Sequence, residues 1–363
     1  MSTGTVFFRA DGNKNIGIGH VMRCLSIADG FSTKGYRVCF ITADHFIEDI
    51  IKGRGYDTDI LNSDYSDMEN ELPKLNDLFI RERNSRIRYI IVDSYYVTYD
   101  YFSGLRMLLS ENPENTKIVY VDDLGRFPYP VDVLINYNLY GPDIDYQTLY
   151  KDDIPEMILG PKYIPLRSMF RGLPVKVQNK AVKDVLISTG GSDPYHLTID
   201  IIRSIVDRYG EGLHITPKYH LLVGSMNQDL NKISELVENQ ANIVLHVNES
   251  DMRSLICEMD ICVSASGSTL YEICACGVPL ITYVMADNQR MGADAFEKKK
   301  LSYNIGDVRN MDDPAEAIMS AIEYMSQQYG YRMDMAKRMQ ELVDGYGTDK
   351  IVDTLISMIV NCD

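Results

Sequence analysis

Short apolar runs alternate with amphipathic stretches along most of the chain. In the first half, apolar runs predict strands at Val6–Arg9, Val38–Thr42, Tyr89–Asp93, Ile118–Asp122 and Val133–Asn136. In the second half, they predict strands at Asp184–Thr189, His220–Val223, Ile243–His246, Ile261–Ser264 and Pro279–Tyr283. Helical patterns separate these runs, notably His20–Thr33 and the segment around Glu71–Glu82. Apolar strands spaced by helices are typical of parallel sheets built from βαβ units.

Two such series in succession predict two doubly wound α/β domains. A chain of 363 residues is also too long for one small core. The polar stretch Phe170–Val182 contains Gly172 and Pro174 and follows neither period, so we place the join there. We expect an N-terminal domain over residues 1–172, a second domain over 181–308 and mostly helical structure over 309–363.

Composition narrows the class of protein. The formal net charge of −16 disfavours a general nucleic-acid binder, which needs a basic face, although helix ends can still hold an anionic ligand. The seven cysteines form no C-x-x-C pair, which is typical of reduced thiols in a cytoplasmic protein. No apolar run approaches the roughly 20 residues of a membrane helix, and the N-terminus lacks a signal-peptide pattern. We therefore expect a cytoplasmic protein without a membrane span.

The first loop of interest follows the first strand. Gly17 and Gly19 precede His20, and this is not the dinucleotide fingerprint because Met22 replaces its third glycine. A helix N-terminus disfavours an imidazolium, so a histidine there suits a general base near pH 7. The alternative is a histidine that caps or packs the helix. The nearby Asp11 and Arg23 would then be a turn residue and a solvated helical charge.

The second loop leaves the strand predicted at Asp184–Thr189. Paired glycines, a hydroxyl and amides near a helix start favour an anion-binding turn, made of Gly190, Gly191, Ser192 and Asp193. The turn lacks the Gly-Lys-Ser/Thr ending of a P-loop, so ATP hydrolysis is not indicated. The alternative is a plain turn in which Asp193 is the N-cap and Pro194 the first helical residue. That alternative does not explain two glycines followed by a serine.

The third loop leaves the strand predicted at Ile261–Ser264. Amides and hydroxyls again gather at a helix start, on Ser266, Gly267, Ser268 and Thr269. Glu272 lies about one turn into that helix, where a carboxylate could accept both ribose hydroxyls of a nucleotide. The alternative is a capping-box pair of Ser268 or Thr269 with Glu272. Two anion-friendly helix starts in one domain favour a nucleotide diphosphate.

The motifs together resemble the PseG family of UDP-2,4-diacetamido-2,4,6-trideoxy-β-L-altropyranose hydrolases and their SpsG-like relatives in spore-coat polysaccharide synthesis. The resemblance rests on Arg9-x-Asp11, Gly17-x-Gly19-His20-x-x-Arg23, Gly190 to Pro194 and Ser264 to Glu272. It continues through "IVDSYYV", "VDDLGR", "LINYNLYG", "GPKYIPLRSMF" and "VDGYGTDKIVDTL" in the same order, over nearly the whole chain. The Ser266–Glu272 element is shared with MurG-like glycosyltransferases and specifies the superfamily only.

The resemblance implies a GT-B fold, in which two Rossmann-like domains face each other across a cleft. It implies that the C-terminal domain binds UDP and that the N-terminal domain holds the sugar and the base. The last helix of such folds often crosses back to the N-terminal domain, which would suit Thr348–Val360.

The resemblance also implies a reaction in which water attacks the anomeric carbon and UDP leaves with inversion, in pseudaminic acid biosynthesis. It makes His20 the base, with Tyr95 completing the catalytic site. It places Tyr163 and Arg167 on the sugar side, where packing is the alternative role, and Asn288 and Gln289 near the nucleotide or sugar. No metal or cofactor is expected, and no His/Asp/Glu cluster has ligand spacing. The alternatives are an inverting GT-B glycosyltransferase that uses a UDP-sugar, and a non-catalytic nucleotide-sugar-binding protein.

Overall fold

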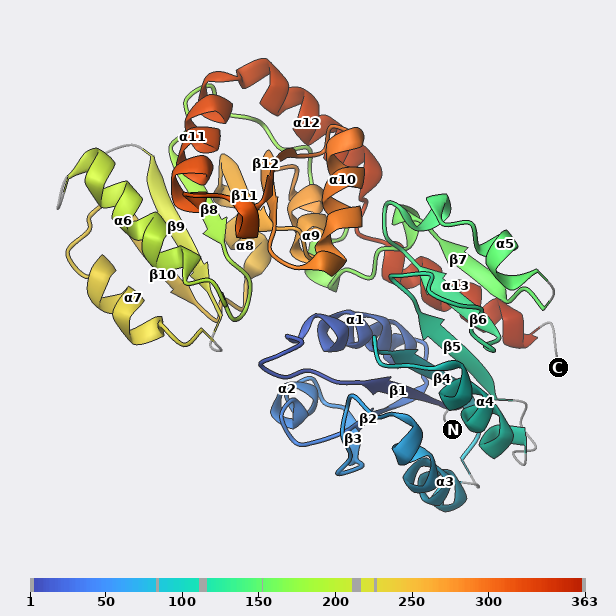
Figure 1. Ribbon diagram of the computed structural model, residues 1–363. Coiled ribbons are helices and arrows are strands. Elements are labelled where there is room, and N and C mark those ends of the chain that lie inside the picture. Colours follow the sequence, from blue (N-terminus) through green and yellow to red (C-terminus); the bar gives the residue numbers. More distant parts are fainter. Residues whose placement is uncertain are drawn as a thin grey trace. The chain divides into compact units, whose positions relative to one another are not determined.

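The computed structural model describes residues 3–82, 85–110, 116–151, 153–210, 217–224 and 227–360, so Cys362 lies outside the described residues. The chain divides into two units, Met1–Arg167 with Tyr346–Asp363, and Ser168–Gly345 (Figure 1). Each unit is built around one sheet whose paired strands all run parallel. The two doubly wound parallel sheets predicted from the sequence are therefore confirmed.

The first unit contains a seven-stranded sheet in the order β3-β2-β1-β4-β5-β6-β7. Its strands are β1 (Thr5–Ala10), β2 (Arg37–Thr42), β3 (Asp57–Ile60), β4 (Ile87–Asp93), β5 (Lys117–Val121), β6 (Val133–Asn136) and β7 (Glu156–Leu159). Its helices are α1 (Gly19–Thr33), α2 (Glu48–Gly53), α3 (Leu72–Arg81), α4 (Tyr99–Ser110), α5 (Tyr146–Tyr150) and α13 (Gly347–Val360).

The central strand β1 is apolar on both faces because helices cover both. Phe7 packs edge-on against Phe79 of α3, with ring centroids 6.3 Å apart. Its neighbour Phe8 points to the opposite face and meets Phe31 of α1 at 6.5 Å. Successive side chains of a strand alternate between faces, so a strand buried on both sides reads as a continuous apolar run.

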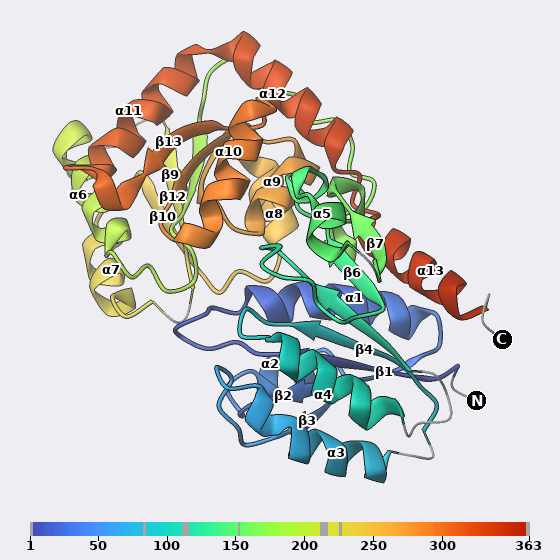
Figure 2. The same ribbon diagram turned by 45° about the vertical axis from the view of Figure 1, so that its right-hand side comes forward.

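Helix α13 returns from the C-terminal part of the chain and lies against α1 (Figure 2). The approach is close at Gly30, where a Cβ atom would come within 2.9 Å of Val352 and 3.0 Å of Thr348. Lys34 Nζ also lies 2.5 Å from the Asp353 carboxylate. The last helix is thus part of the first unit.

The second unit contains a six-stranded sheet in the order β10-β9-β8-β11-β12-β13. Its strands are β8 (Asp184–Ser188), β9 (Lys218–Val223), β10 (Ile243–Val247), β11 (Ile261–Ala265), β12 (Leu280–Val284) and β13 (Tyr303–Asp307). Its helices are α6 (Leu197–Tyr209), α7 (Leu230–Val237), α8 (Met252–Glu258), α9 (Thr269–Cys276), α10 (Arg290–Lys298), α11 (Pro314–Gln327) and α12 (Tyr329–Leu342).

The strand order of each sheet reverses once. In the first unit the reversal lies between β1 and β4, and in the second it lies between β8 and β11. The loops that leave neighbouring strands on either side of such a reversal diverge, which opens a crevice at the carboxyl edge of the sheet. The loops singled out in the sequence leave β1, β8 and β11, which are three of these four strands.

Candidate active site

His20 and Asp93 meet where the strand order of the first sheet reverses. The loop that leaves β1 ends at Gly19, so His20 is the second residue of α1. Asp93 is the last residue of β4, the strand paired with β1 on the other side of the reversal. Both side chains therefore lie at the carboxyl edge of the sheet, where open α/β sheets bind their ligands.

The glycines before His20 shape the loop that leads to it. Gly17 has a φ of +72°, in the left-handed region that favours glycine. Its amide and carbonyl pair with the backbone of Asn13, with N···O distances of 2.8 and 3.1 Å. Gly19 is exposed, and no other atom lies within 4 Å of the position of a Cβ atom. The loop is thus closed on itself at Gly17 and leaves the space beside Gly19 open.

The His20 imidazole is held by a carboxylate. Its Nδ1 lies 2.6 Å from Oδ1 of Asp93, and 3.1 Å from Nη2 of Arg23. Two acceptors would repel at 2.6 Å, so we assign the proton to Nδ1, which donates to Asp93. The Arg23 Nη2 group instead donates to the same Asp93 oxygen, at 2.5 Å. This tautomer leaves the lone pair of the imidazole on Nε2.

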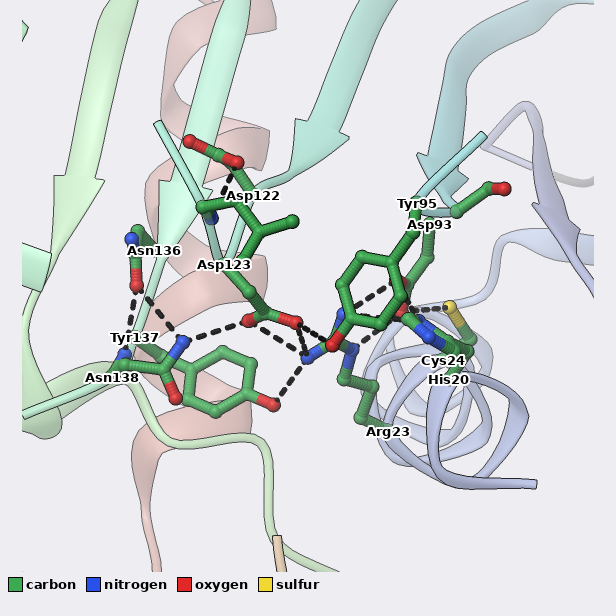
Figure 3. Close-up of polar contacts among 12 residues, drawn as sticks. His20, Arg23, Cys24, Asp93, Tyr95, Asp122, Asp123, Asn136, Tyr137 and Asn138 are labelled. Carbon is green, nitrogen blue, oxygen red and sulfur yellow. Dashed lines mark hydrogen bonds and ion pairs between the residues drawn. The ribbon is translucent and has the colours of Figure 1, made fainter. Parts of the chain in front are cut away.

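Arg23 joins two carboxylates (Figure 3). Its Nε and Nη2 donate to Asp93, each at 2.5 Å, and its Nη1 lies 2.9 Å from Oδ2 of Asp123. The Tyr137 hydroxyl also lies 2.8 Å from Nη1. Burial alone would lower the pKa of Arg23, but Asp123 and Asp93 raise it well above its ordinary value. Arg23 is therefore a buried, paired cation and not the solvated helical charge of the alternative interpretation.

Asp93 is fully buried and ionised. Burial alone would raise the pKa of its carboxyl, but the Arg23 guanidinium and His20 outweigh burial and hold that pKa well below its ordinary value. A carboxylate that stays ionised at neutral pH can accept from Nδ1 of His20 and stabilise a positive charge on the imidazole.

Tyr95 stands beside His20 on the loop after β4. The two rings meet edge to face, with centroids 4.5 Å apart and an interplanar angle of 81°. The Tyr95 hydroxyl donates to Oδ2 of Asp123 at 2.9 Å. The catalytic pair expected from the resemblance, His20 and Tyr95, is thus brought into direct contact.

A small pocket opens at these side chains, with a cavity volume of about 10 Å³. That volume is about the size of a site for one water molecule. The pocket is lined by Asp11, Ile16, His20, Asp93, Ser94, Tyr95 and Tyr96.

Asp11 forms one wall of the pocket and is more than a turn residue. Its Oδ1 accepts from the Ala43 amide at 2.7 Å, and its Oδ2 forms an ion pair with Arg9. Arg9 in turn makes a bidentate pair with Glu71, with N···O distances of 2.8 and 2.7 Å, and both side chains are fully buried. This second buried ion network fixes the position of Asp11.

Three residues of this arrangement were not assigned a role from the sequence: Asp93, Asp123 and Tyr137. Asp93 and Asp123 fall within the quoted "IVDSYYV" and "VDDLGR" stretches. Each acidic residue ends or follows a central strand, β4 or β5. That position, at the carboxyl edge of a parallel sheet, is the signal that could have identified them.

In the second unit, the Gly190 loop lies at the other strand reversal. Gly190 has a φ of +83°, in the left-handed region that favours glycine. A Cβ atom placed on Gly190 would meet no neighbouring atom within 4 Å. Both Gly190 and Gly191 are exposed. A Cβ on Gly224, which follows β9, would lie 2.6 Å from the carbonyl oxygen of Gly191. The backbones of the loops after β8 and β9 therefore approach each other closely at Gly191 and Gly224.

Asp193 faces the helix that follows this loop. Its carboxylate accepts from the amides of Leu197 and Thr198, at 3.0 and 2.8 Å, and from the Thr198 hydroxyl at 2.6 Å. Helix α6 begins at Leu197, so Pro194 is not its first residue as the plain-turn alternative expected. Asp193 is buried and occupies the first amides of α6. The exposed glycine backbone ahead of it is what this loop offers to a ligand.

The loop after β11 leads to α9. Ser266 is buried, and its amide and hydroxyl both donate to the Tyr283 carbonyl, each at 3.0 Å. Ser268 is the N-cap of α9 but makes no side-chain capping bond. Glu272 is then the fourth helical residue, one position beyond the capping-box partner. The Gly267 amide donates to the Ala265 carbonyl at 2.7 Å. The first amides of a helix have no acceptor within that helix, so Ser268 and Thr269 at the start of α9 are suited to an anion.

The remaining predicted residues lie on loops after other strands. Gln289 follows β12, and its Oε1 accepts from the Met285 amide at 2.9 Å, while Asn288 beside it is exposed. Tyr163 and Arg167 follow β7, and both are partly buried. Because β7 lies three strands from β4, roughly 14 Å at 4.8 Å per strand, neither lines the pocket at His20.

Among the residues that the structure describes, no three His, Cys, Asp or Glu side chains are grouped so that they could hold a metal ion. Over the same residues, no helix combines the length and apolar character needed to cross a membrane.

The chain is similar to three known proteins, although no protein-family model matches it. It is 22% identical to the spore coat polysaccharide biosynthesis protein SpsG of Bacillus subtilis, over 95% of this chain and 96% of that protein. It is 22% identical to a UDP-2,4-diacetamido-2,4,6-trideoxy-beta-L-altropyranose hydrolase of Campylobacter jejuni, over 81% of this chain and 96% of that protein. An uncharacterized protein of Methanocaldococcus jannaschii is 23% identical over 80% of this chain, which spans 57% of that protein. The resemblance to the PseG hydrolases and SpsG is therefore confirmed.

Solved structures give the fold. MurG of Acinetobacter baumannii matches 98% of this chain and 100% of its own with a TM-score of 0.67, at 13% identity. The chain has the GT-B fold. A second solved structure is similar to this chain. It is a UDP-GlcNAc 2-epimerase from Neisseria meningitidis bound to UDP-GlcNAc, and it matches 97% of this chain with a TM-score of 0.60 at 14% identity. The GT-B sheets are the seven-stranded and six-stranded sheets of the two units.

Proposed function

We propose that this GT-B protein is an enzyme of sugar or polysaccharide biosynthesis that hydrolyses a UDP-linked amino-deoxy sugar. Water attacks the anomeric carbon C1, the bond from C1 to the diphosphate oxygen breaks, and UDP and the free sugar leave with inversion at C1. The name of the Campylobacter jejuni relative points to 2,4-diacetamido-2,4,6-trideoxy-L-altrose as the sugar. The family resemblance adds pseudaminic acid biosynthesis as the pathway. The observation that carries the proposal is the 2.6 Å contact of His20 with Asp93 at the pocket.

His20 acts as the general base in this proposal. Its Nδ1 proton is committed to Asp93, so Nε2 accepts a proton from the attacking water. Asp93 then stabilises the imidazolium that forms and keeps the ring in one orientation. Tyr95 and Arg23 hold His20 and Asp93 in place, and Asp11 fixes the opposite wall of the pocket.

The pocket beside His20 has a cavity volume of about 10 Å³, which is enough for the attacking water molecule. Hydrolysis is preferred over the alternative, an inverting transfer to an acceptor that His20 deprotonates, because the Campylobacter jejuni relative is named as a hydrolase.

The second unit binds UDP in this proposal. The exposed backbone of Gly190 and Gly191, the Ser192 hydroxyl and the N-terminus of α9 at Gly267, Ser268 and Thr269 would hold the diphosphate. Ser266 and Asp193 shape these two loops, and Glu272 would accept the ribose hydroxyls. Amides that stabilise the departing diphosphate reduce its need for a proton, and the scheme uses no metal or cofactor.

The remaining contacts to substrate are assigned from the resemblance. Gly17 and Gly19 would let the backbone approach the sugar, because the space beside Gly19 is open. Asn288 and Gln289 would lie near the nucleotide or sugar, and Tyr163 and Arg167 would contact the sugar side.

The test is UDP release from the UDP-linked altrose derivative without added metal or acceptor. In ¹⁸O-labelled water, attack at C1 leaves UDP unlabelled, whereas attack at phosphorus labels it. The UDP product decides the question, because the free sugar can exchange its anomeric oxygen with water. His20→Asn should slow release by about 10²–10⁴-fold with UDP affinity unchanged, and the exposed His45→Asn should not.

Other outcomes would favour the alternatives. Release that begins only when an acceptor sugar is added would support the glycosyltransferase. Tight UDP-sugar binding with no turnover in the wild type would support a non-catalytic binding protein.

A further inference from the structure

The carboxylate of Asp123 accepts hydrogen bonds from three different side chains. Its Oδ2 accepts from the Tyr95 hydroxyl at 2.9 Å and from Nη1 of Arg23, also at 2.9 Å. Its Oδ1 accepts from the Asn138 amide nitrogen Nδ2 at 2.7 Å and lies 3.0 Å from the same Arg23 nitrogen. The side chain is only 8% exposed (Figure 3). Asp123 thus ties three side chains from three different segments into one arrangement.

The bond to Asp123 determines what the Tyr95 hydroxyl can do. A phenol has one proton to donate, and here that proton goes to Asp123. Toward any other group, the oxygen of Tyr95 offers lone pairs only. In this arrangement Tyr95 cannot at the same time donate its proton to a departing diphosphate, so it is not the acid of the proposed reaction.

The same carboxylate is linked to the base through Arg23. The guanidinium spans Asp93 and Asp123, and Asp93 holds Nδ1 of His20. The edge-to-face contact of His20 with Tyr95 closes this ring of five side chains. A shift of Asp123 would therefore move Tyr95 directly and the base through Arg23 and Asp93.

We propose that Asp123 is a positioning residue: it accepts the hydrogen bond of the Tyr95 hydroxyl, and so holds that ring against His20 with its oxygen lone pairs available as hydrogen-bond acceptors toward the substrate. The inference rests on the proposed hydrolysis, in which His20 is the base. It adds that Asp123 and Tyr95 act as one unit, and that the leaving UDP receives no proton from Tyr95.

The test compares three variants and one double variant on release of UDP from the UDP-linked altrose derivative. Asp123→Asn places an amide donor or an imperfect acceptor against Tyr95 and Arg23, and should lower kcat by about 10²-fold with the Kd for UDP unchanged. Tyr95→Phe removes the same bond from the other side and should lower kcat by a similar factor. Both changes break the same interaction, so their losses of kcat should not multiply. The kcat of the double variant should stay within about threefold of the kcat of the slower single variant.

Asp122→Asn is the matched control. Asp122 is the adjacent buried carboxylate, but it holds the turn amides of Leu124 and Gly125 and the Tyr146 hydroxyl instead of Tyr95. This variant should lower the melting temperature and keep kcat within about twofold of the wild type. Equal losses of kcat in Asp122→Asn and Asp123→Asn would mean that loop stability alone is at work, and would overturn the inference.

Two further results would also overturn it. One is an Asp123→Asn enzyme with wild-type kcat, and the other is a double variant whose losses multiply. A crystal structure of Asp123→Asn supplies a reading that does not depend on turnover: the Tyr95 ring should leave its edge-on position beside His20, and an unmoved ring would refute the inference. Failure of the wild type to release UDP would refute the proposed hydrolysis, while this structure would still decide the role of Asp123.

Discussion

In the first unit, Nδ1 of His20 lies 2.6 Å from Oδ1 of Asp93, although the two residues are 73 positions apart in the sequence. His20 lies in the first turn of α1 and Asp93 ends β4, and they meet because β1 and β4 are neighbours at the strand reversal. A buried carboxylate on Nδ1 fixes the tautomer of the imidazole and leaves Nε2 to accept a proton. The local chemistry of the proposed base is therefore a consequence of sheet topology.

Asp93→Asn should separate orientation of the base from substrate binding. The amide cannot stabilise an imidazolium and can turn its NH₂ group toward Nδ1, so kcat should fall by about 10²–10⁴-fold. Affinity for UDP, measured by calorimetry, should not change. Cys24→Ser is the control, because its side chain also contacts Asp93, at 3.5 Å, without carrying a charge. Normal turnover by Asp93→Asn would contradict the proposed role of His20.

Glu71→Gln should destabilise the first unit without touching the pocket directly. The substitution keeps the shape of the side chain but leaves the fully buried Arg9 with less negative charge around it. Breaking one partner of a buried ion pair costs about 3–5 kcal/mol of the free energy of unfolding. The same change at Glu82, paired with the exposed Arg37, should cost about 1 kcal/mol or less. Urea unfolding of both variants measures the difference, and equal losses would contradict it.

The sequence pattern predicted the central strands well but missed three of the four edge strands. Fully apolar strands such as β1 and β4 were recognised because both faces are buried. The strands β3, β7 and β13 were not predicted, and each forms an edge of its sheet. The edge strands β3 and β13 are short and carry polar residues, as in "DTDI" and "YNIGD", so they leave no apolar run to detect, whereas the more apolar edge strand β10 was predicted.

The candidate site was also predicted only in part. His20 could be found because its signal is local, two glycines and a helix start within four residues. The partner Asp93 is the last residue of β4, and the partner Asp123 lies on the loop after β5, 100 residues after Arg23. Their meeting depends on the strand order β1-β4-β5, which the alternation of apolar and polar residues does not specify. With the strand order known, the acidic residues at the carboxyl ends of β4 and β5 could have been recognised as partners of His20 and Arg23.

The second unit should lose stability as the pH falls below about 6.5. His246 Nε2 lies 3.0 Å from His220 Nδ1. The other ring nitrogen of His220, Nε2, lies 3.0 Å from Oδ1 of Asp184. The pKa of His246 is lowered mainly by burial and next by the neighbouring His220. Glu249 and Glu258 act in the opposite direction, but the net shift of this pKa is downward. The unfolded chain therefore takes up this proton near pH 6.5, before the folded chain does.

The sign of this effect can be measured directly. The contribution of His246 to stability is present above pH 6.5 and is lost as the pH falls through its lower folded value. His246→Gln should flatten the dependence of the melting temperature on pH between 7 and 5. A steeper dependence in His246→Gln would contradict the assignment.

Gly224→Ala should weaken UDP binding while leaving the pocket at His20 intact. A Cβ there would lie 2.6 Å from the Gly191 carbonyl oxygen, and because this neighbour is backbone, the two loops cannot keep their present spacing. Overpacking of this kind costs about 1–3 kcal/mol, and 1.4 kcal/mol corresponds to a tenfold change in affinity. We therefore expect the Kd for UDP to rise about tenfold by calorimetry. Gly330→Ala is the control, since no atom lies within 4 Å of its Cβ position. Wild-type affinity in Gly224→Ala would show that the Gly190–Gly191 backbone does not hold the diphosphate.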